Sequence, residues 1–123
     1  MKILIENGRV IDPASGLDKV CSVAIAAGRI IAVDRQPKDF APARVIDATG
    51  CIVLPGLVDL AARMREPGHE HERMLESEMA AAVAGGVTSL VCPPDTDPVL
   101  DEPGLVEMLK FRAEKLHQSR LFP

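Results

Sequence analysis

The chain has no tryptophan or tyrosine, and its 123 residues include only three phenylalanines. Its core must therefore be mainly aliphatic, and it lacks the aromatic platforms on which single-stranded nucleic acids stack. Basic residues are also few, because 14 lysines and arginines stand against 18 aspartates and glutamates, which gives a formal charge of −4. This balance does not suit a protein that neutralises phosphates, so we expect no nucleic-acid partner.

Long hydrophobic runs are missing as well. No segment reaches the ~18 consecutive apolar residues that a membrane span needs, so no membrane partner is expected. A lysine and the turn-forming pair Asn7-Gly8 come too early for a secretory signal. The cysteines, Cys21, Cys51 and Cys92, lie far apart, which indicates reduced, buried thiols rather than disulfides or a zinc knuckle. We therefore expect a cytoplasmic protein.

The pattern of the chain changes near residue 55. Residues 1–55 contain short β-type runs separated by turn signals, of which Ala27-Gly28 predicts a hairpin and Asn7-Gly8 a tight turn. The expected strands cover residues 2–6, 9–11, 20–25, 29–33, 44–47 and 51–54.

Residues 56–123 alternate between strand and helix patterns. Strands joined in this way through helices pair in parallel, with right-handed crossovers. Because a parallel sheet must be covered on both faces, we expect an α/β fold that forms the opening of a larger barrel. The expected elements are a strand at 57–62, a helix at 70–84, a strand at 87–92, a helix capped by Asp101 that runs to 116, and a strand from 121. The apolar sides of the two helices comprise Leu75, Met79, Ala82 and Val83, then Leu105, Met108, Leu109, Phe111 and Leu116.

The segment 50–68 carries a family resemblance. The family pattern Pro-Gly-x-x-Asp-x-His-x-His-x-Arg-x-Pro-Gly is matched in register by Pro55, Gly56, Asp59, Arg65, Pro67 and Gly68. The segment closely resembles the opening of the dihydroorotases, which belong to the amidohydrolase superfamily with hydantoinases and allantoinases. The likeness continues through residues 84–88 and reaches 93–99, which resembles the family's Pro-Asn-Thr-x-Pro-Val loop.

This resemblance implies an architecture for the whole chain. It implies that residues 1–55 are part of an N-terminal β-sandwich, and that residues 56–123 are the first two βα units and the start of the third strand of a TIM-type (β/α)8 barrel. Such a barrel needs ~250 residues, so the chain is expected to be a truncated, N-terminal part. Alone, it would expose apolar edges and is expected to associate or be marginally stable, and not to catalyse.

The departures from the family pattern bear on activity. Where the family has two histidines that hold a divalent ion, usually zinc, this chain has Ala61 and Arg63. Alanine offers no lone pair, and arginine brings a fixed positive charge. The resemblance also implies that Arg65 and an asparagine bind the substrate carboxylate, but Asp95 stands at the asparagine position. We expect Asp95 to pair with Arg63 or with Arg65 in a remnant of the pocket.

Other candidate metal ligands receive simpler interpretations. In His69-Glu70-His71 the two histidines would diverge by about 200° on a helix, so a solvated helix start is expected rather than a metal site. His117 is expected on the surface. The acidic group Asp95, Asp97 and Asp101 lacks the spacing of an EF-hand loop.

Two functions remain open at this stage. The favoured one is a catalytically inactive dihydroorotase-like protein, without cofactor, that assembles into an oligomer as the structural partner of aspartate carbamoyltransferase in pyrimidine biosynthesis. The resemblance implies this role because some bacteria carry such inactive homologues. The alternative is an active zinc-dependent cyclic-amide hydrolase, a dihydroorotase that converts dihydroorotate to N-carbamoyl-aspartate through ligands in the later barrel.

Overall fold

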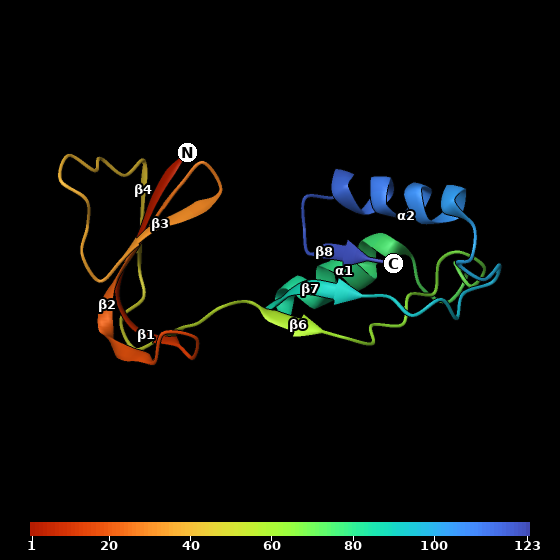
Figure 1. Cartoon of the computed structure of the whole chain (residues 1–123), viewed down its shortest axis with the longest axis horizontal. Coiled ribbons are helices and arrows are strands. Elements are labelled where there is room, and N and C mark those ends of the chain that lie inside the picture. The colour runs from red at the N-terminus through yellow and green to blue at the C-terminus, as the bar shows by residue number, and fades with distance from the viewer. The chain divides into compact units, whose positions relative to one another are not determined.

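A computed structural model describes all 123 residues, and the chain divides into two compact units. Unit 1 comprises Met1–Pro55 and unit 2 comprises Gly56–Pro123, so the division falls where the sequence pattern changes. Figure 1 shows a unit made of strands and loops and a unit in which strands alternate with helices. The structure is therefore mixed α/β, as the sequence predicts.

Unit 1 is one sheet built around its first strand. On one edge β1 pairs with β2 in antiparallel fashion, and on the other edge it pairs with β4 and then β5, both parallel to it. The strands are β1 (Lys2–Asp12), β2 (Leu17–Ala26), β3 (Arg29–Val33), β4 (Arg44–Asp47) and β5 (Ile52–Val53).

The two glycine turns predicted in unit 1 have different outcomes. Ala27 and Gly28 join β2 to β3 as a hairpin with φ angles of 50° and 72°, so that prediction is confirmed. The predicted tight turn at Asn7-Gly8 is wrong, because β1 continues through it as a bulge with a register shift. Asn7 adopts a φ of 65°, which asparagine tolerates without reversing the chain.

Unit 2 is a parallel sheet with two helices. Its strand order is β6-β7-β8, and both pairings are parallel, which confirms the predicted strand–helix alternation. The two helices pack on the sheet and on each other. Neither has the length and apolar character to cross a membrane. The elements are β6 (Leu57–Asp59), α1 (Leu75–Ala84), β7 (Val87–Val91), α2 (Pro103–Lys115) and β8 (Arg120–Phe122).

The core of unit 2 lies between these helices and the sheet. Leu75, Met79 and Leu109 are fully buried, whereas Val83, Met108 and Phe111 are exposed although the sequence predicts them on the buried sides. A helix on one sheet face buries only a narrow stripe, so these flanking positions face away from the core. The buried cluster comprises Met64, Leu75, Met79, Leu90, Cys92, Leu100, Leu109, Ala113 and Leu121.

Helix α1 begins five residues later than predicted. Residues 70–72 form a turn, and the helix starts at Leu75 after Met74, which has an extended backbone. The buried carboxylate of Glu66 accepts a hydrogen bond of 3.1 Å from the Leu75 N–H, one of the donors that a helix start leaves without a partner. The start is thus set by a side chain nine residues away.

The start of α2 and the end of β6 also differ from expectation. Pro103 occupies the first turn as predicted, but the N-cap residue is Glu102, so Asp101 is not the cap. Strand β6 ends at Asp59 rather than at Ala62. The Asp59 carboxylate accepts a hydrogen bond of 2.9 Å from the Ala61 N–H, which closes a turn directly after the strand.

Candidate functional site

Two loops meet beyond the carboxyl ends of β6 and β7. Because the strands are parallel, the segments that follow them leave the sheet at one edge, where α/β proteins place their sites. The N–H of Asp97 donates a hydrogen bond of 3.2 Å to the Pro67 carbonyl. The Arg63 guanidinium Nε lies 3.2 Å from a carboxylate oxygen of Asp95. The two motif loops are therefore in direct contact.

Gly68 allows this close approach. Its φ is 105°, and a Cβ at this position would collide with the carbonyl group of Asp97. Only glycine combines that backbone conformation with the absence of a side chain. In the opposite loop Thr96 is buried, and its hydroxyl donates a 2.9 Å hydrogen bond to the Pro98 carbonyl. The close approach at Gly68 is thus between backbone groups, and the Thr96 side chain holds the opposite loop.

Ala61 and Arg63 lie on the loop just after β6. Both are exposed, and the Arg63 side chain is 72% accessible apart from its ion pair with Asp95. An alanine methyl group has no lone pair, and a guanidinium is always protonated. These two residues do not fit a zinc ion, so no catalytic step through a metal at this point can be derived from them.

Arg65 contacts two acidic residues that follow it in the chain, Glu72 and Glu78. Its Nε lies 3.4 Å from Glu72, and its backbone N–H donates to the Glu78 carboxylate over 3.1 Å. Of the two partners considered for Asp95, the structure pairs it with Arg63. Arg65 instead pairs with Glu72, which was not predicted from the sequence.

Glu66 is the most deeply buried charged residue of unit 2, and it was not predicted as a site residue from the sequence. It is 2% exposed and forms an ion pair with Arg112 of α2. Arg112 also lies 3.5 Å from Glu76 of α1. The only sign of Glu66 in the sequence is that it is an acidic residue within the motif. It stands between Arg65 and Pro67, where the family pattern specifies no residue. Its contacts are with two helices, which makes its role structural.

The three histidines fall in two places. His69 and His71 lie on the turn before α1, so their predicted divergence on a helix is wrong; His117 is exposed just after α2. One donor atom each from His69, His71 and Glu72 lies within 4.8 Å of the others.

Glu70 lies between the two histidines, and its carboxylate accepts a hydrogen bond from the Gly68 N–H. This bond and one from the N–H of Glu70 itself lower the pKa of the Glu70 carboxyl group.

The cysteines are free thiols in different environments. Cys92 is 3% exposed and belongs to the core of unit 2, as expected for a small buried side chain. Burial raises the pKa of its thiol, so it stays protonated and is a poor nucleophile. Cys51 is exposed and Cys21 is half-buried, contrary to the expectation that all three are buried.

Comparison with solved structures defines the class of fold. An L-hydantoinase (dihydropyrimidinase) from Arthrobacter aurescens superposes with a TM-score of 0.77 at 24% identity, over 90% of this chain and 24% of the other. Molinate hydrolase superposes with a TM-score of 0.66 at 26% identity, over 98% of this chain and 29% of the other. The fold is that of a segment of the amidohydrolases.

Comparison of sequences identifies the family. A family model described as Dihydro-orotase-like matches residues 50–123. A dihydroorotase-like protein of Pseudomonas aeruginosa is 46% identical, and a dihydroorotase of Pelobacter propionicus is 42% identical, both over the whole chain. The chain belongs to the dihydroorotase-like family. It spans 29% of the length of each of these two relatives.

Proposed function

We propose that this chain is part of a catalytically inactive dihydroorotase-like protein of pyrimidine biosynthesis, which serves as a structural partner of aspartate carbamoyltransferase. In this proposal unit 1 is a portion of a β-sandwich and unit 2 is the opening of a (β/α)8 barrel. The observation that carries it is the Arg63–Asp95 ion pair at the edge of the sheet, with Ala61 two residues before Arg63 on the same loop.

The first argument concerns the metal. In active family members a zinc ion lowers the pKa of bound water and so supplies hydroxide for hydrolysis of the cyclic amide. Ala61 and Arg63 stand where the family pattern has its first two histidine ligands. A guanidinium at this point repels a cation, which supports loss of the metal and of the nucleophile.

The second argument concerns the substrate. Arginine binds a carboxylate well when its guanidinium is free, but Arg65 is already engaged by Glu72. Asp95 replaces the asparagine of the family pattern, is paired with Arg63, and has no N–H group to donate to a substrate carboxylate. Both features weaken the recognition of dihydroorotate at the same place where the metal ligands are missing.

The proposed role is assembly. The relative from Pseudomonas aeruginosa is named a dihydroorotase-like protein rather than a dihydroorotase, which is in keeping with this proposal. In this role the full protein would hold carbamoyltransferase subunits in an oligomeric complex in the cytoplasm. Three free cysteines are in keeping with that compartment.

A second candidate function is an active dihydroorotase with an unconventional metal site. Relatives at 42% and 46% identity, from Pelobacter propionicus and Solibacter usitatus, are named dihydroorotase, which favours this candidate. Its metal would be held by residues of the later barrel, outside this chain.

One experiment separates the two candidates. The full-length protein that contains this chain is isolated natively from its own cells, co-eluting proteins are identified by mass spectrometry, and dihydroorotate turnover is measured on the same fraction. We expect stoichiometric carbamoyltransferase, and no turnover by the dihydroorotase-like protein after it has been separated. Zinc-dependent turnover of dihydroorotate by the protein, with no carbamoyltransferase co-eluting, would contradict the proposal. The double variant Ala61→His and Arg63→His then tests whether restoring both histidines restores activity.

A further inference from the structure

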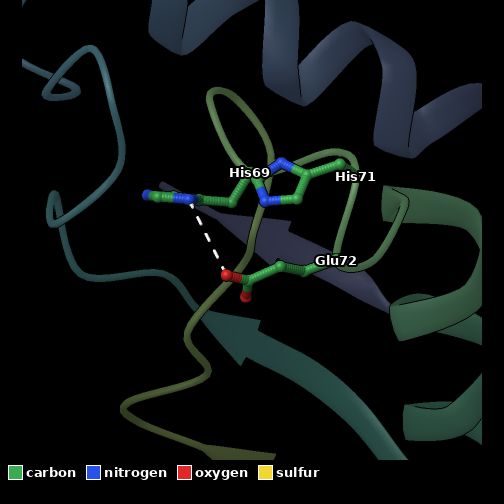
Figure 2. A group of neighbouring side chains, drawn as sticks. All are labelled: His69, His71 and Glu72. Atoms are coloured by element: carbon green, nitrogen blue, oxygen red, sulfur yellow. Dashed lines mark ion pairs between the residues drawn. The ribbon is translucent and has the colours of Figure 1, made fainter.

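The turn between β6 and α1 carries a group of side chains of which the proposed function uses only Glu72, as the partner of Arg65. His69, His71 and Glu72 each place one donor atom within 4.8 Å of the other two. No other three histidine, cysteine, aspartate or glutamate side chains of the chain come together in this way. Figure 2 shows the two rings side by side, with the Glu72 carboxylate below them.

The geometry of the group is close to that of a metal site. His69 Nδ1 lies 3.9 Å from a carboxylate oxygen of Glu72, and the two imidazole centroids are 5.9 Å apart with the rings tilted by 50°. A tetrahedral zinc ion with ligands at about 2.1 Å separates its donor atoms by roughly 3.4 Å. Closing the remaining difference requires rotation of the three side chains, all of which are at least partly exposed.

The turn that bears the group is itself ordered. The His69 N–H donates to the Arg65 carbonyl over 2.7 Å, and the Glu72 N–H donates to the His69 carbonyl over 2.9 Å. One oxygen of Glu72 is 3.4 Å from the Arg65 guanidinium, while the other is the one that faces His69. Metal-binding carboxylates are commonly oriented by such a second partner.

We propose that His69, His71 and Glu72 bind one divalent transition-metal ion of the zinc class, with the remaining coordination position open to water or to another donor. Two imidazoles and one carboxylate are a ligand set that zinc accepts. This site is separate from the Ala61 and Arg63 positions. It does not depend on the proposed function, because it requires neither catalysis nor a partner.

The test uses the whole chain without a histidine tag, after treatment with a chelator. Zn²⁺ is titrated by calorimetry, and Co²⁺ is titrated by visible absorption, which reports four-coordinate geometry. We expect one ion per chain, and His69→Ala or His71→Ala is expected to weaken binding by at least about tenfold. The matched control is His117→Ala, which makes the same substitution at an exposed histidine outside the group.

Two results would overturn the site. One is the absence of saturable binding by the unaltered chain. The other is a loss of metal affinity in His117→Ala or in Cys51→Ser that is as large as the loss in His69→Ala. That result would mean that the metal binds adventitiously to exposed donors. Far-UV circular dichroism of each variant confirms that it is folded. Co-elution of the partner is measured separately, so failure of this site and failure of the proposed function are distinguishable.

Discussion

Unit 1 and unit 2 are ordered by different interactions. Unit 1 is a hydrogen-bonded sheet around β1 with few buried apolar side chains, whereas unit 2 buries nine residues in one cluster beneath two helices. Unit 1 is therefore held together mainly by hydrogen bonds between strands, and unit 2 mainly by packing of buried side chains. The buried apolar residues of unit 1 are Leu4, Val10, Val23, Ala24 and Ala48.

The comparison extends to what each unit leaves exposed. In unit 1, Ile30 and Ile52 are more than half exposed, and in unit 2 Val58 and Leu60 are similarly accessible. A strand or loop with such side chains usually has a further layer over it in a complete domain. The predicted association of the isolated chain would involve these surfaces, and it stays a prediction.

The largest expected effect is in the core of unit 2. Leu109→Ala should lower the free energy of unfolding by about 3 kcal/mol, because it leaves a cavity around a fully buried position. Urea unfolding followed by far-UV circular dichroism measures this, since the chain has no tryptophan or tyrosine to report by fluorescence. The same substitution at Leu60, which is 76% exposed, should cost less than about 0.5 kcal/mol. Equal costs would contradict the core described for unit 2.

Glu66 should give the next largest effect. Glu66→Ala removes the partner of Arg112 and the acceptor at the start of α1, so we expect a loss of about 2 kcal/mol in the same measurement. The control is Glu107→Ala, whose exposed carboxylate pairs only with Lys110 and should contribute at most about 0.5 kcal/mol. If the two variants lose the same stability, the buried ion pair does not link the helices.

Two glycine substitutions, one in each unit, should change the stability of the fold in opposite directions. Gly8→Ala in unit 1 should destabilise by about 1–2 kcal/mol, since its Cβ would lie 2.7 Å from Val53 and 2.9 Å from Ala48. Gly104→Ala in α2 has open space around it and should stabilise by about 0.5 kcal/mol. Melting temperatures measured by circular dichroism provide the comparison. A stabilising Gly8→Ala would mean that the bulge in β1 is not closely packed.

The smallest expected effect is the acid dependence of unit 1. Hydrogen bonds from the Thr49 hydroxyl and from Asn7 lower the pKa of Asp47 in the folded chain. A carboxyl group with a lowered pKa stabilises the fold above its unfolded value of about 3.9, and this contribution is lost as the pH falls through the folded value. Asp47→Asn should therefore lose less stability than the unaltered chain between about pH 6 and pH 3. An unchanged pH dependence of the urea midpoint would contradict this.

Local sequence signals predicted much of the fold. The Ala27-Gly28 hairpin and the strand–helix alternation follow from short-range pattern, and both are present. The bulge at Asn7-Gly8 and the late start of α1 could not be predicted in this way. Both positions have contacts outside the local pattern: Gly8 lies close to Val53 of another strand, and the Leu75 N–H donates to Glu66, nine residues earlier.

The site was predictable to a similar extent. The motif indicated the family and gave Arg63 as one of two partners for Asp95, which is the pair in the structure. The contact of Arg65 with Glu72 was not predicted, because a helix was expected over Glu72. A turn there also brings His69 near His71, which helical spacing had excluded.

The pairing of β1 has a consequence for synthesis on the ribosome. β1 emerges before the other strands of unit 1, and about 30 residues separate its end from β4, the first strand that pairs with its second edge. At the usual rate of translation that edge stays unpaired for roughly 2–6 seconds. The nascent chain therefore presents an open strand edge to chaperones, and to neighbouring chains on the same messenger, before unit 1 can close.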